Sequence, residues 1–232
     1  GFDAVAAKAE TGFVPPLIVV PRVYWQWTGE RVCVQEFISG IPGRDLAAVD
    51  HAGLDRKILA SRGVHAVIKM IVEDGLFHAD PHPGNIFYLP GNRLAFIDFG
   101  MVGRLSPRMR DLTVDIMVGA VRKDYEGIAD AMYQLGTPTR KIDMEAYRAE
   151  VALLAEKYLG KKLKDIELSA MIRDLVQGAT KYGLEIPPDF LLVGKALMTV
   201  EGVGKALDPE LDVYEEAKPH FLEILRRRYS PE

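Results

Sequence analysis

The residues His78-Ala79-Asp80-Pro81-His82-Pro83-Gly84-Asn85, with Asp98-Phe99-Gly100 further along, decide the fold class of this chain. In protein kinases, a catalytic-loop Asp orients the acceptor hydroxyl and an Asn of the same loop holds one Mg²⁺. The Asp of Asp-Phe-Gly holds the metal against the phosphates. The spacing therefore predicts a phosphoryl-transfer site with Asp80 as the catalytic Asp, and with Asn85 and Asp98 as the Mg²⁺ ligands beside ATP.

A β-hairpin is expected between Asn85 and Asp98. Residues 86–89 and 94–97 are apolar, and Pro90-Gly91-Asn92 separates them with turn residues. Such a hairpin brings its two ends together, so that oxygen ligands from separate loops can meet at one cation. We place Phe87 and Ile97 of this hairpin among the residues expected to line the nucleotide site.

Two histidines flank Asp80. We expect His78 to bond the loop backbone and shape the loop. His82 lies two residues after the catalytic Asp, where many protein kinases carry a Lys that touches the transferred phosphate. A partly protonated His could do this in part, and a structural role is an equal alternative. A rival interpretation makes His78, Asp80 and His82 zinc ligands on one face of an extended segment, but it leaves Asn85 and Asp98 unexplained.

Composition limits the class of protein. The chain has 232 residues, 48% of them apolar, which suffices for one large domain or two small ones. Its net charge of -4 argues against a nucleic-acid partner. The single Cys33 excludes an internal disulfide and a zinc site of several thiolates, and it favours a reducing compartment. No apolar run approaches the roughly 18 residues of a membrane span, and no signal peptide is visible. We expect a cytoplasmic protein, and we expect both ends of the chain to be cut from something longer.

The segments before the catalytic loop follow the order of a kinase. Residues 22–27 and 31–36 predict an antiparallel hairpin, and residues 37–42 form a linker with Gly and Pro. That order places Glu36 and Phe37 where a kinase hinge offers backbone groups to adenine. A long helix is predicted over residues 54–74, with its end at Gly75.

The chain after Asp98-Phe99-Gly100 predicts mostly helix. Ser106-Pro107 is a helix start, and further helices are predicted over about 187–205 and 213–228. The predicted fold class is therefore α+β and protein-kinase-like, mainly the helical large lobe with a small strand-bearing remnant of the N-terminal lobe. We divide the chain into residues 1–36 (partial N-terminal lobe), 37–105 (hinge, long helix, catalytic loop and metal-binding hairpin) and 106–232 (helical C-terminal lobe).

The catalytic segment, together with Phe96-Ile97-Asp98-Phe99-Gly100-Met101-Val102-Gly103, is similar to the AarF/UbiB family of atypical kinase-like proteins. Residues 20–25 and 35–42 support this, and the resemblance covers nearly the whole chain. It implies that Asp80 takes the catalytic position, and Asn85 and Asp98 the metal positions. It also implies ATP binding with ATPase-like activity and a role in ubiquinone or other isoprenoid-quinone metabolism. The partners it implies are an isoprenoid lipid, quinone-pathway proteins and the inner face of a membrane.

The chain departs from that family pattern in its N-terminal part. We expect the nucleotide loop rich in Gly and Ala, the strand with the phosphate-contacting Lys and the upstream helical extension to lie before Gly1. The helix with the partner Glu of that Lys should fall near residues 3–10, where Val5 occupies the Glu position and Glu10 is a substitute. The family's membrane-spanning C-terminal helices also have no counterpart. We therefore expect the isolated chain to bind Mg-ATP weakly and to turn it over little.

Two other functions stay open. Small-molecule phosphotransferases of the aminoglycoside and choline kinase type also use a His-x-Asp-x-x-x-x-Asn loop. Alternatively, the chain is a non-catalytic scaffold that binds a nucleotide or a lipid and retains the loop without turnover. The acceptor of a phosphoryl group cannot be identified from these residues.

Overall fold

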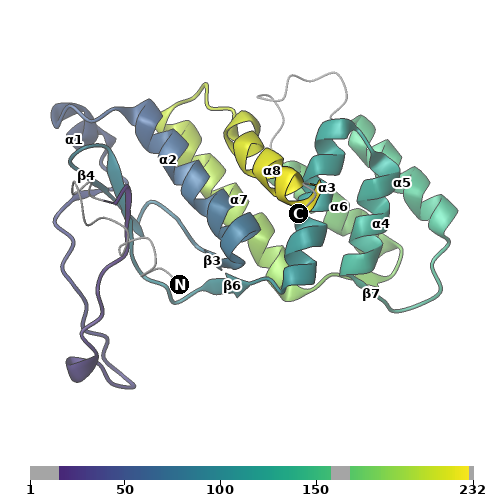
Figure 1. The fold of residues 1–232 in the computed structure, drawn as a ribbon, viewed down its shortest axis with the longest axis horizontal. Helices are drawn as coiled ribbons and strands as arrows, with labels where there is room; N and C mark the ends of the chain where they lie inside the picture. Colours follow the sequence, from purple (N-terminus) through teal and green to yellow (C-terminus); the bar gives the residue numbers. More distant parts are fainter. Residues whose placement is uncertain (1–15, 158–167, 230–232) are drawn as a thin grey trace.

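The computed structural model describes residues 16–157 and 168–229, which form an α+β fold with helices as its larger part. A small sheet lies at one end of the molecule, and the helices α3 to α6 lie at the other (Figure 1). The long helices α2 and α7 connect these two ends. The helix expected near residues 3–10 lies outside the described residues, and the division of the chain at residues 36 and 105 stays a prediction.

The helices after the sheet region are mostly three turns or longer. They are α1 (Leu46–His51), α2 (Arg56–Lys69), α3 (Pro107–Arg122), α4 (Tyr125–Leu135), α5 (Met144–Glu156), α6 (Leu168–Lys181), α7 (Pro188–Leu207) and α8 (Val213–Tyr229). The helix starts that the sequence predicted near residues 107, 188 and 213 are confirmed. Ser106 caps α3, since its side chain accepts a hydrogen bond from the Met109 N–H.

The main sheet contains four short strands in the order β1-β5-β4-β2. These strands are β1 (Ile18–Val19), β2 (Ile41–Pro42), β4 (Ile86–Leu89) and β5 (Arg93–Phe96). Strands β4 and β5 form the predicted antiparallel hairpin, with Tyr88 opposite Leu94. Its turn contains Gly91 and Asn92, both with positive φ, as a tight hairpin turn requires.

The hairpin predicted over residues 22–36 is only in part correct, and we call residues 22–36 the N-terminal ribbon. The chain does fold back on itself there, because the Tyr24 N–H donates to the Val34 carbonyl and the Glu36 N–H to the Arg22 carbonyl. Instead of two regular strands, however, the ribbon contains isolated bridges and a 3₁₀ turn over Trp25–Trp27. Trp25 is 76% exposed, so this segment has little packing to hold it in a regular ladder.

The long helix predicted over residues 54–74 is confirmed, with a change of winding at its end. Asp55 caps α2 by accepting from the N–H groups of Lys57 and Ile58. The last turn, Met70–Asp74, is π-helical and leads to Gly75, which has φ 68°. That left-handed conformation suits Gly, the residue that the sequence marks as the helix end.

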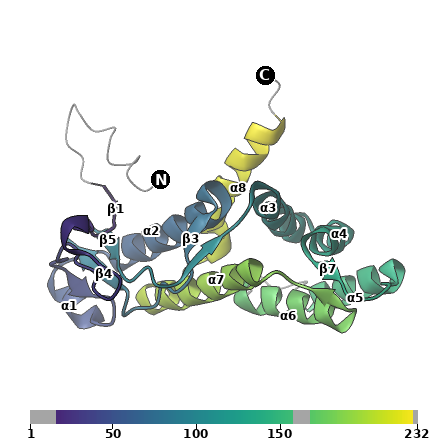
Figure 2. The ribbon, with the colours of Figure 1, turned by 90° about the horizontal axis from the view of Figure 1, so that it is seen from below.

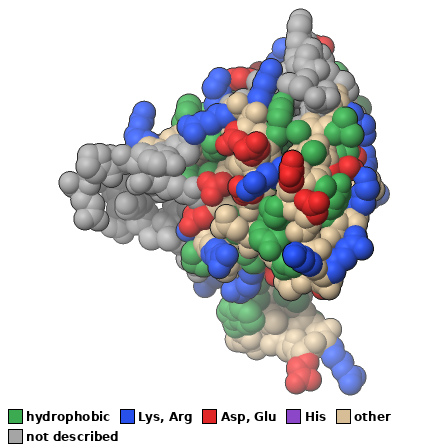
Figure 3. Space-filling view, turned by 90° about the vertical axis from the view of Figure 1, so that its right-hand side faces the viewer, with side chains coloured by type: hydrophobic (Ala, Val, Ile, Leu, Met, Phe, Trp, Pro, Cys, Tyr) green, Lys and Arg blue, Asp and Glu red, His purple; other side chains and the backbone are tan. Residues whose placement is uncertain are grey.

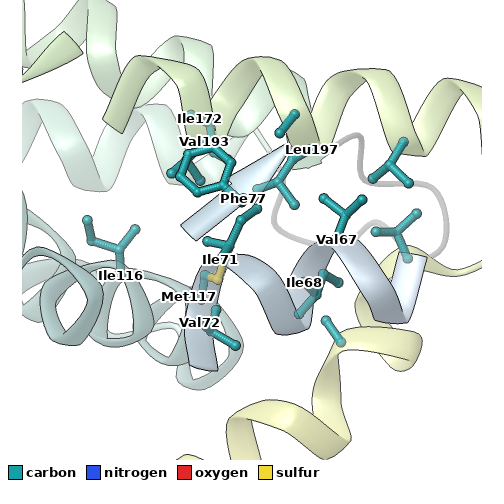
Figure 4. Packing of buried hydrophobic residues seen from close by; sticks show 14 of the residues in the cluster. Val67, Ile68, Ile71, Val72, Phe77, Ile116, Met117, Ile172, Val193 and Leu197 are labelled. Atoms are coloured by element: carbon teal, nitrogen blue, oxygen red, sulfur yellow. The ribbon is translucent and has the colours of Figure 1, made fainter. Parts of the chain in front are cut away.

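The part of the core next to the catalytic segment lies between α2, α7 and two further strands, β3 (Leu76–His78) and β6 (Val102–Arg104). Phe77 of β3 points into the space between α2 and α7, where it lies among Ile71, Val193 and Leu197 (Figure 4). Gly103 of β6 lies against the Phe77 ring so closely that a Cβ there would be 2.2 Å from it. Strands β3 and β6 are thereby fixed on the core.

Helix α8 packs across α2 through a chain of four polar side chains. His65 Nε2 lies 2.7 Å from Glu216 Oε2, and His65 Nδ1 lies 3.1 Å from His220 Nε2. His220 Nδ1 lies 2.6 Å from Glu73 Oε1, in the π-helical turn. This chain ties the last helix to the end of α2, next to the catalytic segment.

The helical end of the molecule contains one small strand pair that the sequence did not predict. Strands β7 (Thr137–Pro138) and β8 (Leu184–Glu185) pair between the helices, as Figure 2 shows for β7 beside α5 and α6. On the face at this end of the molecule, positive and negative side chains are interspersed (Figure 3). In the part of the chain that the structure describes, no helix has the length and apolar character needed to cross a membrane.

Candidate phosphoryl-transfer site

The pairing of β3 with β6 brings the two ends of the catalytic segment together. His78 of β3 lies opposite Val102 of β6, and the Ala79 N–H donates to the Met101 carbonyl over 3.0 Å. Asp80 therefore leaves the sheet beside the residues that follow Asp98. The hairpin β4–β5 fills the space between, because the Ile97 N–H donates to the Asn85 carbonyl.

His78 links the two acidic segments through both of its ring nitrogens. Its Nδ1 accepts from the Asp80 N–H over 3.1 Å, so Nε2 carries the proton and donates to the Ile97 carbonyl over 3.0 Å. The ring is 1% exposed, and this burial lowers the pKa of His78, against the opposing effects of the Ile97 hydrogen bond and the Asp80 and Asp98 carboxylates. These are the contacts that a loop-shaping neutral histidine needs.

The loop after Asp80 turns on its own backbone. The His82 N–H donates to the Asp80 carbonyl, and the Asn85 N–H donates to the His82 carbonyl, each over 2.8 Å. His82 Nδ1 accepts from the Gly84 N–H over 2.9 Å. This contact supports the structural role for His82, in which its ring shapes the loop.

Asn85 and Asp98 have the donor atoms that a Mg²⁺ site needs. Asn85 is 7% exposed, and its amide nitrogen donates to the Asp80 carbonyl over 3.2 Å, which leaves the amide oxygen for a ligand. The Asp98 carboxylate is at the surface, with Oδ1 accepting from the Gly100 N–H. Carboxylate and amide oxygens suit a hard cation, so these residues fit Mg²⁺.

Asp98 holds a strained backbone conformation. Its φ of 56° is in the left-handed region, which costs a non-Gly residue about 1–2 kcal/mol. Such strain persists where the surrounding structure fixes it and is frequent at functional sites. Here the bond from Ile97 to Asn85 on one side and the β3–β6 pair on the other fix the backbone around Asp98.

The zinc interpretation does not fit this geometry. Both His78 nitrogens already have backbone partners, and one His82 nitrogen accepts from the backbone. Within residues 16–157 and 168–229, no three His, Cys, Asp or Glu side chains are grouped to hold a metal. Asp80 instead forms an ion pair with Lys195.

Lys195 is the site residue that sequence reasoning missed. It comes from α7, and its Nζ lies 3.3 Å from Asp80 Oδ1 and 3.3 Å from Met101 Sδ. The sequence holds one signal for it, since Lys195 is the only charged residue from 190 to 200, in a mostly apolar stretch of α7.

The predicted nucleotide-binding residues occupy two places. Phe87 and Ile97 are half-buried, and they lie on the hairpin face opposite the one that carries Tyr88, because side chains alternate along a strand. Glu36 and Phe37 are exposed, Phe37 by 89%. In the part of the chain that the structure describes, the two groups share no hydrogen bond, although the linker approaches Phe87.

The linker over residues 37–42 lies closest to Phe87 at Gly40. A Cβ on Gly40 would be 3.2 Å from the Phe87 Cβ, so the linker runs directly beside β4. An open hollow of about 520 Å³ lies near this linker, lined in part by Ser39, Tyr88 and Asn92. None of the predicted site residues lines it, so the candidate site is at the loops around Asp80 and not in this hollow.

Known protein families and relatives match most of this chain. Residues 6–132 match the ABC1 atypical kinase-like domain, and residues 151–212 match the UbiB helical domain. The chain is 36% identical over 220 residues to the "Probable protein kinase UbiB" of Azotobacter vinelandii, covering 93% of this chain and 41% of that protein. The protein of the same name from Xanthomonas oryzae pv. oryzae is also 36% identical, with 92% and 40% covered.

One solved structure also matches this chain in part. It is the complex of Rv3197 with erythromycin from Mycobacterium tuberculosis, 19% identical, with a TM-score of 0.48 over 89% of this chain and 55% of that one. The chain spans about two fifths of the length of the curated relatives it matches.

Proposed function

Because the chain belongs to the ABC1/UbiB family of atypical kinase-like proteins, we propose that it forms the catalytic part of an ATP-dependent kinase or ATPase. The observation that carries this proposal is that backbone contacts join Asp80 to the two predicted metal ligands, through His78 toward Asp98 and through the Asp80 carbonyl to Asn85. His78 bonds both the Asp80 backbone and the residue before Asp98. These contacts support an arrangement in which Asp80, Asn85 and Asp98 act together, as a phosphoryl-transfer site requires.

In this proposal each residue has one role. Asp80 orients water or an acceptor hydroxyl and takes up its proton, while Asn85 and Asp98 hold Mg²⁺. When bound, Mg²⁺ would neutralise charge on the phosphates. Asn85 is preorganised by its hydrogen bond to the Asp80 carbonyl, so the groups around the phosphates need little rearrangement. Phe87, Ile97 and the backbone at Glu36 and Phe37 would line the nucleotide.

We further propose that this activity serves isoprenoid-quinone metabolism at the inner face of a membrane. The support is the likeness to proteins named UbiB and the match of residues 151–212 to the UbiB helical domain. The phosphoryl acceptor is left open, and a small-molecule hydroxyl or water would each satisfy the geometry at Asp80.

The test is Mg-ATP binding and hydrolysis by the protein at its full natural length. We expect hydrolysis that Asp80→Asn reduces by about 10²-fold or more, in the range that removal of a catalytic group produces. Asp80→Asn should leave nucleotide affinity close to the original value. Binding without any hydrolysis in the unchanged protein would favour the non-catalytic scaffold.

The metal roles are tested separately by calorimetric titration. A carboxylate is a stronger ligand for a hard cation than an amide. Asp98→Asn should therefore weaken Mg-nucleotide binding more than Asn85→Asp does. Equal or reversed effects would contradict the assignment of Asp98 as the main metal ligand.

A further inference from the structure

Helix α7 lies outside the kinase-like domain, yet it brings the side chain of a lysine to the catalytic loop. Lys195 lies beyond residue 132, where the match to that domain ends, and within the UbiB helical domain. Its Nζ nevertheless lies 3.3 Å from Asp80 Oδ1. Among the described residues, Lys195 is the one cation paired with Asp80 in the structure. A charge from the second domain thus completes the site of the first.

The position of Lys195 is fixed by the packing of α7. Val193 and Leu197, on either side of it, are buried against Phe77 of β3 (Figure 4). At the start of α7, Asp189 Oδ1 accepts from the Arg104 N–H of β6 over 3.3 Å. Helix α7 is thereby bound to both strands that carry the catalytic segment, so the backbone at Lys195 is held within side-chain reach of Asp80.

The pair with Asp80 is not explained by stability. Lys195 is 38% exposed and Asp80 30% exposed, and ion pairs this accessible to water contribute little to folding. An ammonium in contact with both Asp80 and Met101 stands between the catalytic Asp and the residues after Asp98. That is the side on which Asp98 would hold the metal and the phosphates.

The catalytic loop contains no Lys or Arg from residue 78 to residue 85. His82 occupies the position two residues after Asp80, and its Nδ1 accepts from the Gly84 N–H. Phosphoryl transfer depends on positive charge around the transferred group. We propose that Lys195 is a catalytic residue that supplies this charge, with its ammonium in contact with the γ-phosphate of ATP. This inference rests on the proposed ATP-dependent function.

The proposed phosphoryl transfer needs no proton from Lys195. The bond from the γ-phosphorus to the bridging oxygen breaks, and ADP leaves with that oxygen. A bond forms to the oxygen of water or of an acceptor hydroxyl, and its proton passes to the Asp80 carboxylate. Lys195 keeps its proton throughout and offsets negative charge on the γ-phosphate oxygens.

The test compares two nucleotides in the protein at its full natural length. Lys195→Met removes the charge and keeps an unbranched side chain of similar length. Calorimetry would measure the affinity of the protein for Mg-ADP and for a Mg-bound non-hydrolysable ATP analogue. Only the analogue carries a γ-phosphate. We therefore expect Lys195→Met to weaken the affinity for the analogue by about tenfold and to change the affinity for ADP by less than about twofold. The ATPase kcat should fall by about 10²-fold, as for loss of one charge-stabilising donor.

Two further variants sharpen the result. Lys195→Arg keeps the charge and should retain most of the preference for the analogue over ADP. Lys218→Met is the matched control, because Lys218 also forms an accessible ion pair, with Glu215 on α8 away from the site. It should change neither affinity nor kcat. Thermal unfolding of Lys195→Met should stay within 2–3 °C of the unchanged protein, which separates loss of charge from loss of fold.

The outcomes distinguish this inference from the proposed function. If the unchanged protein hydrolyses ATP and loses activity in Asp80→Asn, while Lys195→Met equals the unchanged protein, Lys195 is not catalytic and the proposed function stands. An equal loss of affinity for ADP and for the analogue would also overturn the inference, since contact with the γ-phosphate cannot produce it. A protein that binds neither nucleotide would overturn both.

Discussion

The hairpin β4–β5 and the N-terminal ribbon (residues 22–36) start from similar sequence patterns and reach different structures. Both have aromatic and β-branched residues on either side of a turn that contains Gly. The hairpin forms regular antiparallel strands with Tyr88 and Phe96 buried against α2 and its neighbours. The ribbon forms isolated bridges with Trp25 and Trp27 exposed. A strand pattern becomes a regular ladder when a second layer covers one of its faces.

The largest effect should come from removing a buried ring of the hairpin. Phe96→Ala should lower the free energy of unfolding by about 3–5 kcal/mol, because it leaves a cavity in the core. Trp25→Ala in the ribbon should stay within about 0.5 kcal/mol, the usual range for an exposed side chain. Chemical denaturation of both variants measures this difference, and equal losses would mean that the ribbon is packed like the hairpin.

The two turns should respond differently to the same substitution. Gly91 of the hairpin has φ 77° and free space at its Cβ position, whereas Gly29 of the ribbon has the same space without a positive φ. Gly91→Ala should therefore cost about 1–2 kcal/mol for the left-handed backbone, and Gly29→Ala should cost nothing. Unfolding curves of the pair isolate the backbone term. A loss in Gly29→Ala as large as in Gly91→Ala would refute it.

Asp98, just past the hairpin, should show a trade between stability and ligand binding. Asp98→Gly relieves the positive φ at this residue but adds chain entropy to the unfolded state, so we expect a net gain of about 0.5–1 kcal/mol. The same variant should lose Mg-nucleotide binding, because the carboxylate is gone. Asp45→Gly is a control without positive φ, and it should only destabilise by loss of the α1 cap. Destabilisation in Asp98→Gly would show that the strain is not present.

The smallest effect should be a dependence of stability on pH at His78. Burial lowers the pKa of His78 below its ordinary value of 6.5, so the unfolded chain binds a proton more readily than the folded one. The stability from neutral His78 is present above pH 6.5 and is lost as pH falls toward the lowered value. His78→Gln should flatten this slope in urea denaturation between pH 7 and 5. His51→Gln, on the exposed helix α1, should leave it unchanged.

The sequence predicted the structural features that depend on neighbouring residues. The strand β4 matches its predicted bounds, Gly75 ends the π-helical turn that follows α2, and Ser106 caps α3. These features depend on turn residues, caps and alternation within about ten residues. The roles predicted for Asp80, Asn85 and Asp98 stay predictions, although the structure brings these three residues to one set of adjoining loops.

Contacts between distant parts of the chain could not be read in the same way. Lys195 reaches Asp80 because α7 packs on α2 and β3, and no local pattern encodes that docking. The same holds for His65 and His220, which lie 155 residues apart. The prediction of regular strands in the N-terminal ribbon was only in part correct for a related reason. Residues with high β-propensity do not form a regular ladder of hydrogen bonds when no second layer packs against them.

The π-helical turn at Met70–Asp74 has a consequence for how the catalytic segment tolerates insertions and deletions. A π-helical turn holds one residue more than an α-helical turn. Deleting one residue here would restore α-helical winding, and the chain beyond it would leave the helix in nearly the same direction, because the wider turn has already taken up the extra residue. Phe77 would then stay in the core and His78 would keep its contact with the Ile97 carbonyl. Deleting one residue from the α-helical part of α2 offers no such compensation and would rotate the catalytic segment by about 100°.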